Sequence, residues 1–400
     1  MKIGIIGGGA SGLAAAIAAK TEQHEVIIFE RENRVGKKIL ATGNGRCNLS
    51  NVGASDKNYH GSDPTFVNGA VRRYWVQQTL DFFSTLGILC KEEENGKIYP
   101  YSDTASAVLD VLRRRTAELG VKTICGFDVK CAEKTQVGFE VESYGGEKDV
   151  CDRLIIAAGG KASPNLGSNG SGFELLKGFG HRITKLSPSL VQLRTETEVV
   201  KKLKGIKVNA GLTLGDNFAQ GELLFTDYGL SGPPVFTLSA YLGNEKEIYA
   251  DIMPEYTYDD IVSMLYERCA YLYNVSLEEF FTGMLNKRVG QALMKFVGIS
   301  PLSRPASTLC EGEIKKLAST IKAWKFNITG TMSWNNAQVT HGGAVTSEFN
   351  SVTMESKLVK GLYACGEVLD IDGDCGGYNL QWAWSSGHLA GIYSAKENKK

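Results

Sequence analysis

The chain has 400 residues, 43% of them hydrophobic, which is enough to bury a large core and favours about two or three domains. Its 44 Lys and Arg residues balance 44 Asp and Glu residues, so no basic excess indicates a nucleic-acid partner. The nine cysteines are scattered without a C-x-x-C pair, which favours a reduced protein over a disulfide framework or a zinc site. We therefore expect no metal and no nucleic acid.

The chain opens with a glycine-rich turn between an apolar run and an alanine-rich run, IGIIGGGASGLAAAIAAK from residue 3. Gly7, Gly9 and Gly12 fit the G-x-G-x-x-G spacing, between a predicted strand at 3–6 and a predicted helix at 10–19. In such a turn the first glycine allows the tight bend, the second lets a pyrophosphate approach the backbone, and the third brings the helix close to the strand. The helix N-terminus then favours an anion.

A second predicted strand, EVIIFE at 25–30, ends in an acidic residue. Glu30 lies about 20 residues beyond the glycines, where a carboxylate accepts hydrogen bonds from ribose hydroxyls. Strand, helix and strand complete a βαβ unit. The sequence therefore predicts nucleotide binding, and at this point FAD and NAD remain undistinguished.

Helical and strand patterns follow in turn. Residues 66–88 and 104–120 have the spacing of helices, and the second ends on a glycine. Residues 121–160 alternate in short runs separated by polar turns, as in a β-meander, and end in RLIIAAGG. Two glycines follow that last strand directly, and they allow the chain to pass close beneath a bound cofactor.

The middle of the chain differs in character. Residues 190–251 contain strand-like runs that favour a mainly β domain. Two helical patterns follow, and each begins with a capping-box arrangement or one close to it: Thr257 with Asp260, and Ser276 with Glu279. In the second pattern, apolar residues from 277 to 296 follow one helical stripe. Both predict helices of a packed helical subdomain.

Residues 360–396 have a pattern similar to that of the N-terminal segment: a short apolar strand, an acidic loop, a glycine pair and a small-residue helix. In FAD proteins of the glutathione-reductase superfamily, a late strand with an acid supports the ribityl and phosphate part. A helix N-terminus that follows faces the flavin pyrimidine ring. This resemblance favours FAD over NAD.

Three segments make the resemblance more specific: GKKILATGNGRCNLSN at 36–51, GELLFTDYGLSGPPVF at 221–236, and TMESKLVKGLYACGEVLDIDGDCGGYNLQWAWSSGHLAG at 353–391. Together they resemble the bacterial NAD(P)/FAD-dependent oxidoreductase family, whose members include aminoacetone oxidases and clostridial 3-dehydro-bile acid delta(4,6)-reductases. The resemblance covers essentially the whole chain. One departure is THGGA at 340–344, where the family leads us to expect a small residue in place of His341.

The resemblance implies an α/β fold with a glutathione-reductase-like, discontinuous FAD-binding Rossmann domain, an inserted β domain and a small helical subdomain. We assign residues 1–189 and 335–400 to the FAD-binding domain. The inserted β domain then takes residues 190–252 and 313–334, and the helical subdomain takes residues 253–312.

The loop at 36–51 is the richest in predicted cofactor contacts. Lys37, Lys38 and Arg46 supply cations beside backbone N–H and amide donors. A cation near the flavin N1–C2 edge stabilises anionic reduced flavin. Cys47 lies in the same loop without a paired cysteine, so a buried, inert thiol is the favoured interpretation. The residues expected to contact FAD are Gly7, Gly9, Ala10, Ser11, Gly12, Glu30, Arg31, Lys37, Lys38, Thr42, Gly43, Asn44, Gly45, Arg46, Cys47, Asn48, Val129, Ala158, Gly159, Gly160, Gly366, Glu367, Asp370, Gly377, Tyr378, Asn379 and Leu380.

An enzyme that reduces an alkene with flavin needs a proton donor at the alkene carbon that does not receive the hydride. It also needs a hydrogen bond to the activating carbonyl. His341, which departs from the family pattern, is a candidate donor peculiar to this chain. The full set of candidates is His341, Tyr378, Tyr228, His60 and Tyr59.

The sequence thus predicts an FAD-dependent oxidoreductase in which NAD(P)H is a transient co-substrate and hydride passes to a C=C bond conjugated to a ketone. The expected substrate is a small molecule such as a 3-oxo bile acid or a steroid-like enone. Without a signal-peptide pattern or an apolar run of about 18 residues, we expect a cytoplasmic protein that does not enter a membrane. Three alternatives remain open: an oxygen-dependent, aminoacetone-like amine oxidase, a flavin-dependent RNA-modifying enzyme, and a non-catalytic nucleotide-binding protein. No oligomeric state is predicted.

Overall fold

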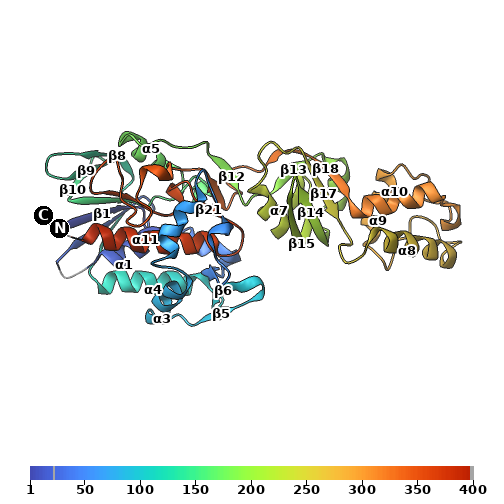
Figure 1. Ribbon diagram of the computed structural model, residues 1–400, viewed down its shortest axis with the longest axis horizontal. Helices are drawn as coiled ribbons and strands as arrows, with labels where there is room; N and C mark the ends of the chain where they lie inside the picture. Colours follow the sequence, from blue (N-terminus) through green and yellow to red (C-terminus); the bar gives the residue numbers. More distant parts are fainter. Residues whose placement is uncertain (21–22, 397–400) are drawn as a thin grey trace. The chain divides into compact units, whose positions relative to one another are not determined.

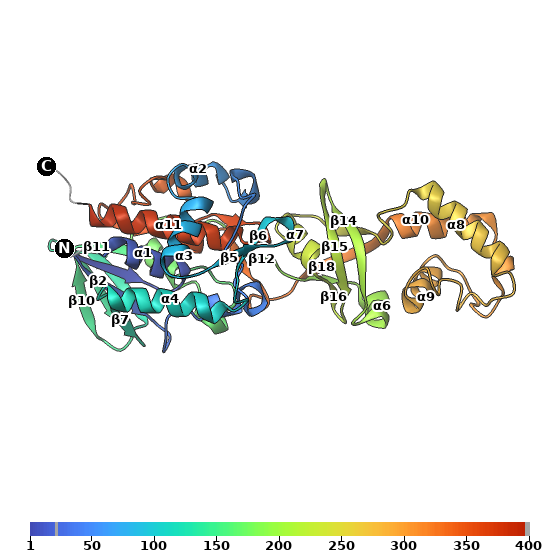
Figure 2. The ribbon, with the colours of Figure 1, turned by 90° about the horizontal axis from the view of Figure 1, so that it is seen from below.

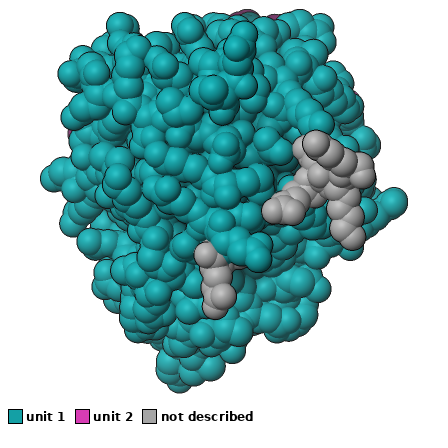
Figure 3. Space-filling view, turned by 90° about the vertical axis from the view of Figure 1, so that its left-hand side faces the viewer, with its two compact units in different colours: residues 1–189, 334–400 teal, residues 190–333 magenta. Residues whose placement is uncertain are grey.

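The computed structural model describes residues 1–20 and 23–396 (Figure 1). They divide into two compact units, which Figure 3 colours teal and magenta. Unit 1 consists of residues 1–189 and 334–400, and unit 2 consists of residues 190–333.

A five-stranded parallel sheet with the order β20-β11-β1-β2-β7 forms the centre of unit 1. Because the strands are parallel, all their carboxyl ends lie at one edge, where ligands bind in folds of this kind. The predicted βαβ unit is present and leads into this sheet. The strands and first helix are β1 (Lys2–Ile6), α1 (Ala10–Ala19), β2 (Glu25–Glu30), β7 (Lys122–Cys125), β11 (Arg153–Ile156) and β20 (Leu362–Ala364).

The two ends of the sequence meet in this unit. Helix α11 (Tyr378–Ala395) packs along α1, as both ribbon views show (Figures 1 and 2). A Cβ at Gly387 would lie 2.3 Å from the Ser11 carbonyl oxygen, and one at Gly391 would lie 2.3 Å from that of Ala15. The helices therefore touch backbone to backbone, which small residues alone permit.

The segment at 121–160, predicted as a β-meander, is more varied than expected. Its three central strands form an antiparallel sheet of order β10-β9-β8, whereas β7 and β11 at its two ends belong to the parallel sheet. Short apolar runs have the same appearance in either kind of sheet, so periodicity did not separate them. The meander strands are β8 (Val129–Lys134), β9 (Phe139–Ser143) and β10 (Lys148–Cys151).

The rest of unit 1 surrounds these sheets. The segments predicted as helices at 66–88 and 104–120 contain α2, α3 and α4, separated by turns. The remaining helices and strands of the unit are β3 (Ser50–Asn51), β4 (Tyr59–His60), α2 (Asn68–Val71), α3 (Val76–Thr85), β5 (Cys90–Glu92), β6 (Lys97–Pro100), α4 (Ala105–Glu118), α5 (Ser171–Gly178), β12 (Ser187–Ser189), β19 (Val339–His341) and β21 (Asp372–Gly373).

Unit 2 contains a closed barrel with the strand order β13-β16-β15-β14-β17-β18. Large apolar side chains fill it, among them Leu212, Phe225 and Trp324, all with 0% exposure. Its elements are β13 (Leu193–Thr195), α6 (Thr197–Val200), β14 (Lys207–Leu214), β15 (Asn217–Phe225), β16 (Gly229–Ser231), α7 (Pro233–Ser239), β17 (Glu247–Asp251) and β18 (Trp324–Thr331).

The helices of unit 2 are α8 (Tyr258–Tyr271), α9 (Lys287–Phe296) and α10 (Glu311–Lys322). The capping box of Thr257 is present, since the Asp260 N–H donates to its hydroxyl over 3.2 Å and the Thr257 N–H donates to the Asp260 carboxylate over 2.9 Å. The helix predicted from Ser276 is wrong in its first half. Gly283 has φ +85°, where a helix ends, and α9 begins only after Asn286 caps it. A separate helical subdomain at 253–312 stays a prediction.

A membrane-spanning helix needs length and sustained apolar character. Over residues 1–20 and 23–396, no helix combines the two.

Candidate functional site

The glycine turn after β1 lies at the carboxyl edge of the parallel sheet, and its three predicted glycines meet different surroundings. A Cβ at Gly7, where φ is +103°, would lie 2.5 Å from the Ala157 carbonyl oxygen. One at Gly12 would lie 1.9 Å from the Gly7 carbonyl oxygen. Gly9 has no atom within 4 Å of its Cβ position and begins α1 without a side-chain cap. The space beside Gly9 at the uncapped start of α1 is therefore open, as an anion site requires.

Glu30 ends β2 and holds the same turn in place. Its carboxylate accepts a 2.7 Å hydrogen bond from the Gly8 N–H and a 2.9 Å bond from the Glu32 N–H. Burial raises the pKa of Glu30, and these two backbone bonds oppose that rise. Each carboxylate oxygen has a further lone pair, so hydroxyl donors can still bind it.

Arg31 and Val129 belong to the two segments that meet at the end of β2. The Phe127 N–H donates to the Glu30 carbonyl over 3.0 Å, which brings the start of β8 next to the end of β2. Arg31 donates from Nη2 to Asp128 over 3.2 Å, while its buried Nη1 has no partner among the described residues. The segments that carry the predicted contacts Glu30, Arg31 and Val129 therefore lie next to one another.

The three cations of the loop are already paired with carboxylates. Lys37 contacts Glu32 at 2.5 Å, and Lys38 contacts Glu367 at 2.9 Å. The Arg46 Nε donates to Asp103 over 2.9 Å, and its guanidinium also binds Glu93. Each charge is thus balanced by a carboxylate, and these ion pairs help to hold the loop. A contact of the three cations with the flavin stays a prediction.

Residues 42–48 turn back sharply through left-handed conformations. Gly43, Asn44, Gly45 and Cys47 have φ values of 56°, 55°, 85° and 62°. The Cys47 side chain is fully buried, and burial raises the pKa of its thiol to about 12, which keeps it protonated. An inert thiol is what the sequence predicted. The loop ends at Asn48, whose buried Oδ1 has no partner among the described residues.

The N-terminus of α11 lies against this loop. Gly377 begins the helix with φ +102° and no side-chain cap, and a Cβ there would lie 2.8 Å from Asn48 Oδ1. Asn379 accepts from the Gly373 N–H over 2.8 Å and donates to the Gly373 carbonyl over 2.7 Å, which ties the first turn of α11 to β21. Tyr378 follows Gly377 directly, and its carbonyl accepts from Tyr59 over 2.9 Å.

Thr340, which the sequence analysis did not identify, joins two parts of the sheet edge. Its N–H donates to Glu367 over 2.8 Å, and its hydroxyl accepts from the Lys161 N–H over 2.7 Å and the Ala162 N–H over 3.0 Å. A Cβ at Gly160 would lie 2.3 Å from the Thr340 hydroxyl and 2.5 Å from Glu367 Oε1. Gly160 therefore has no room for a side chain. In the sequence, the only feature that drew attention to Thr340 was the neighbouring His341.

Among the catalytic candidates, His341 has the most distinctive surroundings. Its Nδ1 lies 2.9 Å from Oδ1 of Asp372, a carboxylate with 0% exposure that the sequence analysis also missed. The hydrogen bond to Asp372 raises the pKa of His341, and burial opposes that rise. The other Asp372 oxygen, Oδ2, is buried without a partner among the described residues.

The remaining candidates are placed less favourably. His60 lies 2.8 Å from Asp374, and Tyr59 is buried. Tyr228 belongs to unit 2, between β15 and β16, so unit 1 does not contain it. Asp370, predicted as a cofactor contact, accepts from the Ser62 N–H over 3.1 Å and its hydroxyl over 2.5 Å. These bonds fix the Asp370 side chain, and its contact with the cofactor stays a prediction.

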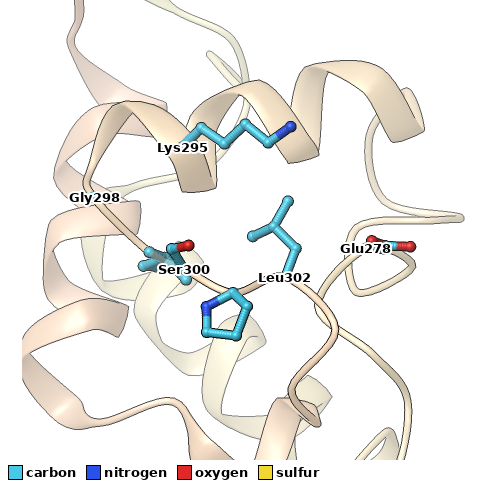
Figure 4. A pocket seen from close by; sticks show the side chains of 7 residues that line it. Glu278, Lys295, Gly298, Ser300 and Leu302 are labelled. Atoms are coloured by element: carbon cyan, nitrogen blue, oxygen red, sulfur yellow. The ribbon is translucent and has the colours of Figure 1, made fainter.

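A hollow of about 350 Å³ lies in unit 2 (Figure 4). Glu278, Lys295, Ser300 and Leu302 are among the residues that line it, and none of its lining residues was a predicted site residue. In the described part of the chain, no group of three or more His, Cys, Asp or Glu side chains is arranged to hold a metal.

The residues of unit 1 fit a dinucleotide such as FAD. The open space at Gly9 admits a pyrophosphate to the α1 N-terminus, and Glu30 offers acceptors for ribose hydroxyls. The uncapped N-terminus of α11 and the unpartnered Asn48 Oδ1 provide polar groups for a second end of the cofactor. Arg31 Nη1 adds an unpartnered donor beside Glu30.

Comparison with known proteins gives matches over the whole chain. Residues 1–393 match the family model described as the HI0933-like protein Rossmann domain. The chain is 38% identical to a 3-dehydro-bile acid delta(4,6)-reductase of Clostridium scindens, with 99% of each chain covered. It is 31% identical to a ribosomal RNA dihydrouridine synthase of Escherichia coli, over 96% of this chain and 95% of the relative. A ribosomal RNA dihydrouridine synthase of Haemophilus influenzae is 29% identical, with 98% of each chain covered.

Proposed function

The chain belongs to the HI0933-like Rossmann family and is an FAD-dependent oxidoreductase, and we propose that it reduces a C=C bond conjugated to a ketone in a small molecule. The observation that carries this proposal is the 38% identity, over 99% of both chains, to a reductase of 3-dehydro-bile acids. Unsaturated 3-oxo compounds of the bile-acid or steroid type are therefore the substrates we propose.

Unit 1 supplies the residues that would hold FAD. The turn of Gly7, Gly9 and Gly12 would receive the pyrophosphate, and Glu30 the ribose. The N-terminus of α11 and the loop that ends at Asn48 would receive the flavin. When bound and reduced, FAD would supply the hydride that adds to the carbon β to the ketone.

Besides the hydride, the reaction needs groups that the side chains of the protein supply. Addition to the β-carbon leaves negative charge on the α-carbon and the carbonyl oxygen, so the reaction needs a proton and a hydrogen-bond donor. We assign the proton to His341, whose hydrogen bond with Asp372 raises its pKa. Tyr378 is our candidate donor to the carbonyl, because burial raises the pKa of its phenol and keeps it protonated.

NAD(P)H is the proposed source of the electrons. Anaerobic mixing of the flavin-loaded protein with NADH or NADPH should bleach the flavin absorption. A 3-oxo compound with a conjugated double bond should then restore it and yield the saturated ketone. If aminoacetone bleaches the flavin whereas neither nicotinamide does, the protein is an amine oxidase and the proposal is wrong.

A second candidate is the reduction of uridine in RNA, which the identity to ribosomal RNA dihydrouridine synthases favours. The uracil C5=C6 bond is conjugated to the C4 carbonyl, so the same hydride and proton addition produces dihydrouridine. With these relatives, the expectation that the chain has no nucleic-acid partner is not supported. Incubation of the reduced protein with unmodified ribosomal RNA, followed by mass spectrometry of the nucleosides, separates the two substrates.

A further inference from the structure

Asp372 is a buried acid, and few groups around it balance its charge. The carboxylate has 0% exposure, one hydrogen bond to His341 Nδ1, and an Oδ2 without a partner among the described residues. A buried carboxylate is costly unless a cation or several donors balance it. The structure provides one such group, the imidazole of His341.

The pair stands next to two anchors of the predicted cofactor site. Thr340, directly before His341, is bonded to Glu367 and to the chain at Lys161 and Ala162. Gly373, directly after Asp372, is bonded to Asn379 in the first turn of α11. The bonds of Thr340 and Gly373 therefore restrain the backbone beside His341 and beside Asp372. A side chain that transfers a proton needs such a fixed position.

The charge of Asp372 decides which nitrogen of His341 carries which hydrogen. Because an ionised carboxylate only accepts hydrogen bonds, we take Nδ1 of His341 as the donor to Asp372. Nε2 then carries a second hydrogen only when the imidazole is charged. The His341 side chain is 37% exposed, so water can return a proton to it.

We propose that Asp372 is the positioning residue for His341, holding Nδ1–H and balancing the imidazolium so that Nε2–H is presented as the proton donor. This inference rests on the proposed function. In the step, His341 would give its Nε2 proton to the α-carbon, where the C=C π electrons form the new C–H bond, while the β-carbon takes the hydride that bound, reduced FAD would supply, and the saturated ketone results. His341 is left neutral and regains its proton from water.

The charged groups that face His341 agree with this role. Asp370 lies on the same segment and also raises the pKa of His341, although less than Asp372 does. Strand β12 pairs with His341 through Ser187, which is uncharged. Strand β4 places His60 opposite Asp372 in the ladder, and His60 is bonded to Asp374.

The test uses flavin-loaded full-length protein with Asp372→Asn, and Asp372→Ser as a second variant in case the first does not fold. His341→Gln assigns the resonance of His341 among the five histidines in a pH titration by NMR. Glu348→Gln is the matched control, because it removes the carboxylate beside His181, which lies 3.0 Å from it. Flavin absorption checks cofactor retention in each variant.

We expect the Asp372 variants to lower the pKa of His341, whereas Glu348→Gln moves only that of His181. Anaerobic reoxidation of the reduced protein by an enone should slow about tenfold or more in the Asp372 variants. The alkaline limb of its pH profile should move to lower pH. In His341→Gln the rate should fall about 100-fold or more and this limb should disappear.

Two results are distinguishable failures. If the enone reoxidises the wild-type protein but the Asp372 variants keep the wild-type pH profile and His341 pKa, the positioning role is overturned and the proposed function stands. If no enone reoxidises the wild-type protein, the proposed function fails, and the role of the pair fails with it.

Discussion

The two units achieve their structures in different ways. At the sheet edge of unit 1, glycines let backbone segments approach so closely that a Cβ at Gly12 would lie 1.9 Å from a carbonyl oxygen. In the barrel of unit 2, large side chains such as Phe225 and Trp324 fill the interior. The proposed cofactor site of unit 1 therefore depends on backbone geometry that one added atom disturbs, whereas the fold of unit 2 depends on the apolar volume that fills its barrel.

The largest expected effect comes from Gly12→Val. The new side chain would overlap the Gly7 carbonyl, and the strain should cost about 3 kcal/mol or more and abolish flavin binding. Circular dichroism and flavin absorption measure the two effects. Gly9→Ala is the matched control, since no atom lies within 4 Å of its Cβ position. It should fold normally and bind flavin about tenfold more weakly, because the methyl group fills the approach to α1.

Trp324→Ala tests the other unit. Removal of this fully buried indole from the barrel should destabilise unit 2 by about 3–5 kcal/mol. Flavin absorption should be retained at low temperature, because the residues that we propose hold the cofactor lie in unit 1. Urea unfolding followed by circular dichroism measures the loss of stability. Release of flavin before unit 2 unfolds would contradict the assignment of binding to unit 1.

Glu30→Ala should weaken flavin binding while the protein stays folded. The lost acceptors should cost about 1–3 kcal/mol, a rise of roughly 10- to 100-fold in the dissociation constant. Equilibrium dialysis against FAD measures it. Unchanged affinity would remove Glu30 from the ribose site.

The stability difference between the wild-type protein and Asp372→Asn should depend on pH. The hydrogen bond to Asp372 raises the pKa of His341 in the folded state. The stabilisation is therefore complete below the unfolded value of about 6.5 and is lost as pH rises through the folded pKa. Thermal melts across this range should show the advantage of the wild-type protein shrinking. A constant difference would mean that the charge of His341 is not coupled to Asp372.

The smallest effect is expected from Lys37→Ala. Its ion pair with Glu32 is partly exposed, and such pairs contribute about 0–1 kcal/mol. Denaturant midpoints should hardly change, and flavin binding should weaken less than in Glu30→Ala. A larger loss of flavin affinity would show that the Lys37 cation acts on the cofactor directly.

The sequence predicted the parts of the molecule that depend on local spacing. The turn of Gly7, Gly9 and Gly12, helix α1 and strand β2 follow from glycine spacing and apolar runs. The helix predicted from Ser276 failed because Gly283 takes a left-handed conformation that a stripe of apolar residues does not reveal.

Contacts between residues far apart in the sequence could not be predicted from local patterns. Lys38 pairs with Glu367 across 329 positions, and His341 meets Asp372 across 31. Thr340 becomes an anchor only because the fold brings residues 161–162 to it. The sequence identified residue types suited to the chemistry. The fold decides which of them are paired with an opposite charge and which can still bind a ligand.

The central claim is that one cofactor site in unit 1 delivers a hydride and a proton across a conjugated double bond. Reduction of a 3-oxo-4-ene steroid by the flavin-loaded protein with NAD(P)H in deuterated water, followed by NMR of the product, tests it most directly. We predict a saturated ketone that carries deuterium on the carbon next to the carbonyl. Recovery of unchanged enone, or an alcohol formed at the carbonyl, would contradict the claim.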